Sequence, residues 1–83
     1  MAYELVYTRR AREDILKLDR LAQRRLARKM EELAEDPFRQ SKKIHDPALG
    51  SYRFRIGDYR VIFDLDGLKI IILRVGHRRE VYR

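Results

Sequence analysis

The chain has 83 residues, a mass of 10.1 kDa and a formal net charge of +7 at neutral pH. This length allows one hydrophobic core, so we expect a single domain over residues 1–83, and a hydrophobic content of 45% excludes a globally disordered chain. With no cysteine and two histidines, the composition excludes a zinc–thiolate site and a thiol nucleophile, and we expect no metal and no cofactor. The longest apolar run, residues 70–73, is too short to cross a membrane, so we expect a cytoplasmic protein with no membrane contact.

The first half of the chain is predicted to form a strand followed by two helices. Residues 3–7 contain β-branched and aromatic side chains, which favours a short strand. Thr8 is a suitable helix N-cap. Apolar residues then recur at 11, 15, 18, 22, 26, 30 and 33, which is one face of an amphipathic helix. A single long helix would satisfy this periodicity, but Asp19 can cap a second helix. We therefore predict a helical hairpin, 9–18 and 20–35, that ends before Pro37.

The second half is predicted to be an irregular basic connector, 37–50, followed by three strands and a polar tail. The strands are expected at 51–56, 59–65 and 69–75, because two-residue turns, Gly57-Asp58 and Asp66-Gly67, separate them. The tail begins at Gly76. The third strand is the most uniformly apolar, so we expect it to be central in the sheet and covered on both faces.

The predicted fold is therefore α+β in two layers: an N-terminal strand, a helical hairpin and an antiparallel β-meander. We expect the apolar stripe of the helices to pack on one face of the meander. The residues predicted to meet in this core are Ala11, Ile15, Leu18, Leu26, Met30 and Leu33 from the helices and Phe54, Val61 and Phe63 from the strands.

The excess positive charge lies in the second half of the chain. Residues 37–83 contain eleven basic and five acidic residues, whereas residues 1–36 contain nine and eight. A localised positive field attracts polyanions, most often nucleic acid, although a solubilising surface or an acidic protein partner would also need such charge. Arginine outnumbers lysine 15 to 5, and its planar fork matches phosphate.

Strand periodicity predicts where three of these arginines lie. Arg53 and Arg55 alternate with apolar residues, so both fall on the polar face of their strand. A two-residue turn at Gly57-Asp58 would place Arg55 directly opposite Arg60, and like charges in that position are unfavourable. A bound phosphate would compensate for this repulsion. Alternatively, nearby aspartates screen the pair, or the register differs. The face that carries Arg74 cannot be assigned from the sequence.

The tail carries the side chains that an RNA-cleaving site needs. His77, Arg78, Arg79 and Tyr82 lie within six residues, and they could accept a proton, stabilise a phosphorane and protonate a leaving group. Such a site would cleave RNA by attack of the RNA's own 2′-hydroxyl, and this reaction needs no metal. The alternative is a frayed basic tail in which Tyr82 packs as a hydrophobic contact.

Two stretches, GDYRV at 57–61 and GHRREVY at 76–82, together with the order of elements, identify a resemblance. The chain resembles the RelE/ParE superfamily of type II toxins, on the RelE side. The resemblance implies that Arg60 stabilises the scissile phosphate, that Arg78 assists the leaving group or transition state, and that Tyr82 stacks on or orients the substrate base. Arg53 and Arg55 stand where the best-known members have lysines.

The arginines at those two positions can hold phosphate but cannot shuttle a proton. The general base would then be His77, Tyr82 or His45, of which we favour His77. We expect Arg53, Arg55, Lys42 and Lys43 to bind substrate.

The resemblance also implies partners and an activity. The expected function is an mRNA endoribonuclease that cleaves in the ribosomal A site and contacts ribosomal RNA. A cognate antitoxin would neutralise it, and operator DNA would be bound only through the antitoxin complex. Two alternatives remain: a ParE-like inhibitor of DNA gyrase, and a catalytically inactive RNA-binding member.

Overall fold

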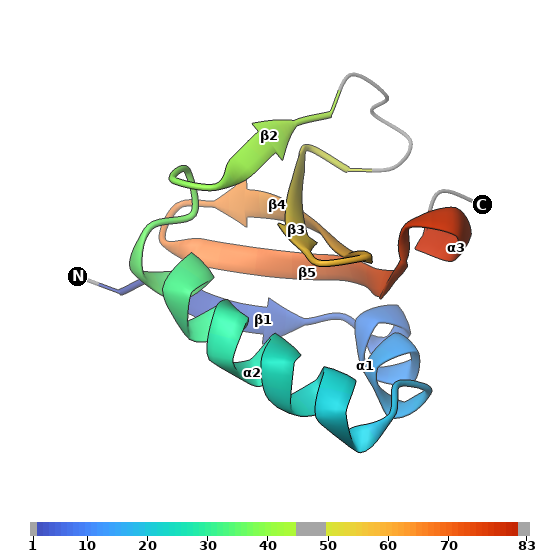
Figure 1. The fold of residues 1–83 in the computed structure, drawn as a ribbon. Helices are drawn as coiled ribbons and strands as arrows, with labels where there is room; N and C mark the ends of the chain where they lie inside the picture. The colour runs from blue at the N-terminus through green and yellow to red at the C-terminus, as the bar shows by residue number, and fades with distance from the viewer. Residues whose placement is uncertain (1, 45–49, 82–83) are drawn as a thin grey trace.

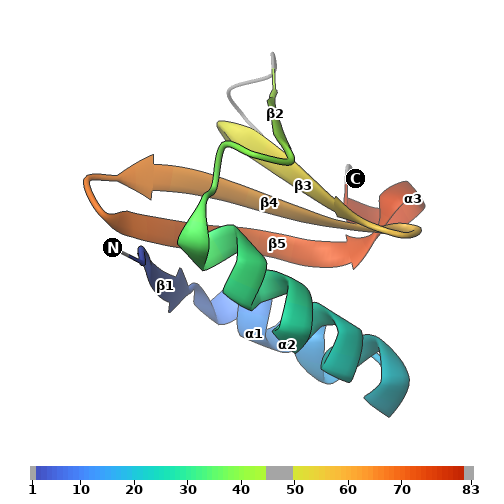
Figure 2. The ribbon, with the colours of Figure 1, turned by 60° about the vertical axis from the view of Figure 1, so that its left-hand side comes forward.

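A strand, a helical hairpin and a mixed sheet make up the fold in the computed structural model, which describes residues 2–44 and 50–81. In chain order the elements are β1 (Glu4–Tyr7), α1 (Arg9–Leu16), α2 (Arg20–Glu35), β2 (Ser41–Lys43), β3 (Tyr52–Ile56), β4 (Tyr59–Asp66), β5 (Lys69–His77) and α3 (Arg78–Val81). The strands form one five-stranded sheet in the order β1-β5-β4-β3-β2. Helices α1 and α2 lie against one face of this sheet, and the opposite face carries no long helix (Figures 1 and 2). The predicted two-layer α+β fold is confirmed.

The helical hairpin begins and breaks at the two predicted caps. The Thr8 side chain accepts a hydrogen bond from the Ala11 backbone N–H at 3.1 Å, and Asp19 Oδ1 accepts one from Ala22 at 2.7 Å. Each cap satisfies a backbone donor that the first turn of a helix leaves unpaired. The second helix ends at Asp36, whose extended backbone precedes Pro37 as predicted.

The β3–β4 hairpin has the predicted register. Ile56 pairs with Tyr59 and Arg55 with Arg60 across the two-residue turn. Gly57 has a φ of +59°, a left-handed conformation that glycine adopts without steric cost. The central position predicted for the third meander strand is also confirmed, since β5 lies between β1 and β4. Its outward-facing Ile71 is half-buried, so β5 is covered on that face only in part.

Several parts of the sheet differ from the prediction. The second two-residue turn is Gly67-Leu68 and not Asp66-Gly67, because Asp66 still pairs with Lys69 across it. β1 pairs in parallel with β5, a partner that the sequence pattern did not identify. The connector is not wholly irregular, because residues 41–43 form the edge strand β2, antiparallel to β3. Lysine-rich edge strands lack the apolar alternation that marks interior strands, which explains the omission. The third strand also extends to His77, and the predicted polar tail forms the short helix α3.

An irregularity in β5 brings both halves of that strand onto the core. The pairing with β4 runs from Val75 through Arg74 and then to Ile72, so Leu73 is an extra residue at this point. Such a bulge shifts the side-chain alternation by one residue. Ile72 and Val75 therefore both face the helices, although they are three positions apart.

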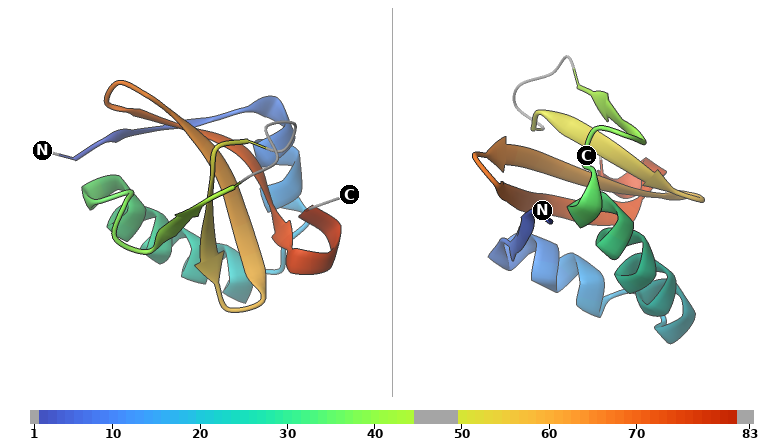
Figure 3. Two further views of the ribbon diagram at one scale, coloured as in Figure 1. Left: turned by 90° about the horizontal axis from the view of Figure 1, so that it is seen from above. Right: turned by 90° about the vertical axis from the view of Figure 1, so that its left-hand side faces the viewer.

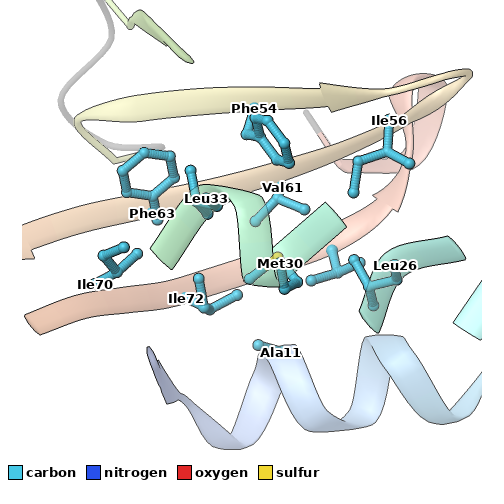
Figure 4. Close-up of a cluster of buried hydrophobic side chains, with 11 residues drawn as sticks. Ala11, Leu26, Met30, Leu33, Phe54, Ile56, Val61, Phe63, Ile70 and Ile72 are labelled. Atoms are coloured by element: carbon cyan, nitrogen blue, oxygen red, sulfur yellow. The ribbon is translucent and has the colours of Figure 1, made fainter. Parts of the chain in front are cut away.

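The core fills the space between the helices and the sheet (Figure 4). All of the predicted core residues belong to it, with Ile15 and Leu18 at its partly buried margin. Its buried members are Ala11, Leu26, Met30, Leu33, Phe54, Ile56, Val61, Phe63, Ile70, Ile72 and Val75. This core packs on one side of the sheet only. Within the described ranges, none of the helices combines the length and the apolarity needed to cross a membrane.

Candidate functional site

Four cationic side chains come together on the sheet face that the long helices leave uncovered. Lys42 of β2 pairs with Arg53 of β3, and Arg55 of β3 pairs with Arg60 of β4. Successive outward positions on β3 place these two pairs in neighbouring rows of the same face. We call these four residues the basic face. Figure 3 shows that α1 and α2 lie together on one side of the sheet, and the pairing places the basic face on the other side.

The Arg55–Arg60 pair is tolerated because the Arg60 guanidinium lies back against its own turn. Arg60 Nη1 donates to the Gly57 and Tyr59 carbonyl oxygens, both at 2.9 Å, and the residue is only 6% exposed. The carbonyl dipoles offset part of its charge, whereas Arg55 is exposed to solvent. The Arg60 guanidinium is thus held by its own turn, whereas the Arg55 side chain faces solvent.

Three carboxylates of the helices, Glu13, Asp14 and Glu32, pair with cations outside the basic face. The ion pairs are Arg9–Glu13, Arg10–Asp14, Lys29–Glu32 and Arg74–Asp14. Across residues 2–44 and 50–81, no carboxylate forms a salt bridge with Lys42, Arg53 or Arg55. Those three side chains and Gln40 line a shallow hollow of about 150 Å³. Its chemistry suits an anion such as a phosphate group.

The tail begins next to the basic face. The Arg78 backbone N–H donates to the Asp58 carbonyl at 2.9 Å, so α3 starts against the turn that also holds Arg60. Val81 is 1% exposed, and its side chain packs close to Gly76. The tail is therefore held through Val81, while the Arg78 side chain is exposed beside the turn.

His77 lies on the opposite side of the sheet from the basic face. Gly76 occupies the β5 position opposite Arg60, so strand alternation turns the next side chain toward the helices. The His77 ring contacts Tyr59 edge-on at 6.1 Å, and its Nδ1 accepts from the Arg79 N–H at 3.3 Å. The structure thus does not bring His77 together with the arginines, contrary to the expectation for a general base beside them.

The remaining predicted residues divide into two groups. Lys43 pairs with Tyr52, whose ring stacks on Phe63 of the core at 5.4 Å, so alternation places Lys43 on the helix side and not on the basic face. The structure therefore does not bring Lys43 together with Lys42, because adjacent residues of a strand point to opposite faces. Tyr82 and His45 lie outside the described residues.

Beyond the basic face, Ile62 and Leu73 lie close to the end of the connector at Gly50. Gly50 lies so near them that a Cβ built on it would be 2.7 Å from Ile62 Cγ2 and 2.9 Å from Leu73 Cδ1. Its φ of +139° also disfavours any side chain. Asp64 Oδ1 accepts from the Ser51 N–H at 2.8 Å and holds the strand entry in place. Gly50 and Ser51 thus cover part of this side of the sheet beyond the basic face.

Sequence analysis missed one polar residue in this region. Asp14 is 7% exposed, and its Oδ2 accepts hydrogen bonds from Arg74 Nε and from the Val75 backbone N–H, both at 2.9 Å. Its spacing from Ala11 and Leu18, three and four residues, places it on the buried helix stripe, and this was the available signal. A charged residue on a buried stripe requires partners, which β5 supplies.

The titratable groups of the described residues do not form a metal site. In the part of the chain that the structure describes, no three His, Asp or Glu side chains gather closely enough to hold a metal ion. What the basic face can do chemically is bind phosphate and stabilise negative charge, because guanidinium groups keep their protons.

Known proteins of similar sequence and fold belong to one group. Residues 5–82 match the family described as "ParE toxin of type II toxin-antitoxin system, parDE". The chain is 34% identical over 89 residues to Toxin RelG of Mycobacterium tuberculosis, covering 100% of this chain and 99% of that one. Its fold is similar to a chain of the RelBE2 toxin-antitoxin complex from the same species, with a TM-score of 0.85, 28% identity, and 94% and 100% of the two chains covered. A mutant of Escherichia coli toxin RelE in the free state gives a TM-score of 0.79 at 26% identity, with 99% and 92% covered.

Proposed function

This chain belongs to the ParE toxin family of type II toxin–antitoxin systems, within the RelE/ParE superfamily, and from that premise we propose that it is a ribosome-dependent mRNA endoribonuclease. The observation that carries the proposal is the basic face, next to which helix α3 of the tail begins at Arg78. Phosphate binding and transition-state stabilisation need cations at fixed positions, and Arg60 and the Arg78 backbone are both held by the β3–β4 turn.

The proposed reaction breaks one phosphodiester bond of the mRNA in the ribosomal A site. The 2′-hydroxyl gives its proton to a base, and its oxygen attacks the adjacent phosphorus. The bond to the 5′-oxygen breaks, that oxygen takes up a proton, and the products are a 2′,3′-cyclic phosphate and a 5′-hydroxyl end. Arg60 and Arg78 stabilise the charge that develops on the nonbridging oxygens, while Arg53, Arg55 and Lys42 bind neighbouring phosphates. No step requires a metal ion.

The proton acceptor is not supplied by the arginines of the basic face. Arginine does not release its proton under physiological conditions, so the base lies elsewhere. We propose that Tyr82, which comes one residue after the buried Val81, is the proton acceptor. Tyr82 would also orient the substrate base. His77 remains a candidate only if the tail rearranges on the ribosome, because its ring lies on the helix side.

The proposed partners follow from the same face and from the relatives. Several structural relatives are complexes of a toxin with its antitoxin, which supports a cognate antitoxin for this chain. Binding of an acidic antitoxin segment to the cations would block access of RNA. The same positive charge suits docking on ribosomal RNA, and an enzyme that acts on translating ribosomes works in the cytoplasm. Operator DNA would be bound only through the antitoxin complex.

Primer extension on a defined mRNA tests the proposal. Cuts at A-site codons are expected when the mRNA is on programmed ribosomes and not when the same mRNA is free. Arg60→Ala and Arg78→Ala should each weaken the cuts severely, and the double variant should abolish them. Arg24→Ala, which removes the same charge from the exposed side of α2, should leave them. Folded protein that yields no cuts on ribosomes, or cuts that persist in the Arg60→Ala/Arg78→Ala double variant, would refute this assignment.

The second candidate function is inhibition of DNA gyrase. It is favoured by the description of the matched family, which names ParE toxin. A gyrase inhibitor acts by binding a protein and needs no phosphate chemistry, so the basic face would then serve another purpose. A supercoiling assay with the same preparation distinguishes the two: inhibited supercoiling without mRNA cuts would favour gyrase, and the reverse result would exclude it.

A further inference from the structure

Among the residues that the structure describes, no strand pairs with one side of the β5 end that leads into the tail. The parallel pairing with β1 stops at Tyr7↔Ile72, whereas β5 continues to His77. At this point the chain leaves the sheet and enters α1. The Thr8 backbone N–H and hydroxyl both donate to the Ile72 carbonyl, at 3.1 and 2.8 Å. Helix α1 therefore starts beside the strand edge and runs along it.

Asp14 takes the place of the missing strand. Its Oδ2 accepts from the Val75 N–H, which would otherwise be a buried donor without a partner, and from Arg74 Nε. One carboxylate oxygen thus binds two consecutive residues of β5. A buried carboxylate costs desolvation free energy, and an apolar residue of similar size often stabilises a core better. Its presence is better explained by the position that it imposes on the strand than by stability.

The two residues that Asp14 binds follow directly after the bulge at Leu73, where the register of β5 is open to error. Beyond the bulge, the observed register places Gly76 opposite Arg60 and brings the Arg78 N–H to the Asp58 carbonyl. A shift by one residue would turn every later side chain to the other face. The carboxylate therefore selects the register in which the tail starts beside the basic face.

We propose that Asp14 is a positioning residue of the nuclease site: through Arg74 and Val75 it fixes β5 beyond the bulge and so aligns Arg78 with Arg60. This role rests on the proposed function. Asp14 touches no substrate. Its effect reaches the site along one short stretch of β5, and this makes the proposal testable through Arg78.

Single-turnover cleavage of ribosome-bound mRNA is the first test. Asp14→Ala and Asp14→Asn should lower the rate at saturating toxin by about 10- to 100-fold, because small misplacements of catalytic groups have effects of this size. The toxin concentration at half saturation should change by less than about two-fold, since the cations of the basic face that dock on RNA are untouched. Asp14→Asn keeps an acceptor for the Val75 N–H and so guards against loss of the fold, but it lacks the negative charge that holds Arg74. Ile70→Val, a core truncation before the bulge, should reduce stability but not the rate.

A double-mutant cycle separates positioning from general destabilisation. If Asp14 acts by aligning Arg78, then adding Asp14→Asn to Arg78→Ala should reduce the rate no further than Arg78→Ala alone. Hydrogen exchange provides a readout that does not depend on activity. The Val75 amide should exchange slowly in the wild-type protein and at least about ten-fold faster in Asp14→Ala, while the Val61 amide is unchanged.

The outcomes distinguish the two proposals. Absence of cleavage by the wild-type protein would refute the nuclease function and, with it, this role. Cleavage by the wild-type protein with an unchanged rate in both Asp14 variants would refute only the positioning role. Fully additive losses in the cycle would also overturn it, because Asp14 would then act independently of Arg78.

Discussion

Removal of one arginine from the basic face should lower the salt dependence of RNA binding by a fixed increment. Each phosphate that a protein cation neutralises releases a counterion, and the binding constant for a single strand then falls with a log–log slope of about −0.7 per contact. Four cations, Lys42, Arg53, Arg55 and Arg78, have side chains that are exposed or half-buried in this region. They predict a total slope of about −2.8, and thus about a 50-fold loss of affinity between 50 and 200 mM salt. Arg55→Ala should reduce the slope to about −2.1 and the loss to about 20-fold.

Fluorescence anisotropy measures this slope directly. A labelled single-stranded RNA with 2′-O-methyl groups throughout cannot be cleaved, so the assay reports binding alone. Arg24→Ala is the matched control, because it removes an equal charge from the exposed side of α2. It should leave the slope within about 0.2 of the wild-type value, since that surface contacts no phosphate. Equal decreases for Arg24→Ala and Arg55→Ala would show that net charge, and not the basic face, governs binding.

Three further predictions concern local structure and stability. Gly50→Ala should destabilise the fold by about 3 kcal/mol, because both the φ of Gly50 and its closeness to Ile62 oppose a Cβ. Gly67→Ala, with open space around it, should cost about 1–2 kcal/mol from its φ alone. Urea unfolding compares the two variants, and equal costs would contradict the steric argument. Asp19→Ala should cost about 1 kcal/mol by removing the α2 cap, and Asp19→Asn should restore most of it, as thermal melts followed by circular dichroism would show. Burial raises the pKa of the Tyr7 hydroxyl above its usual value of 10.0, so the folded state favours the neutral phenol. The contribution of Tyr7 to folding stability is therefore full below about pH 10 and falls as the pH rises further. Tyr7→Phe should reduce this loss of stability at alkaline pH.

The candidate site was only partly predictable from the sequence. Alternation along β3 and the two-residue turn correctly placed Arg53, Arg55 and Arg60 on one face. The same rule, applied to β5, fails at the bulge, so the faces of Arg74 and His77 could not be assigned before the register with β4 was known. Lys42 joined the basic face only because β2 pairs with β3, a contact between segments without apolar alternation.

What the sequence by itself determined is local. The helical hairpin, its caps at Thr8 and Asp19, and the β3–β4 turn depend on residues within a few positions of one another, so their signals are complete in short windows of the chain. The tertiary structure alone decided the parallel pairing of β1 with β5, the bulge at Leu73 and the contact of Asp14 with Val75, which lies 61 positions away. These features depend on which edge of the sheet each segment meets and at what register. That choice minimises unpaired backbone groups and exposed apolar surface over the whole domain, and no local segment encodes it.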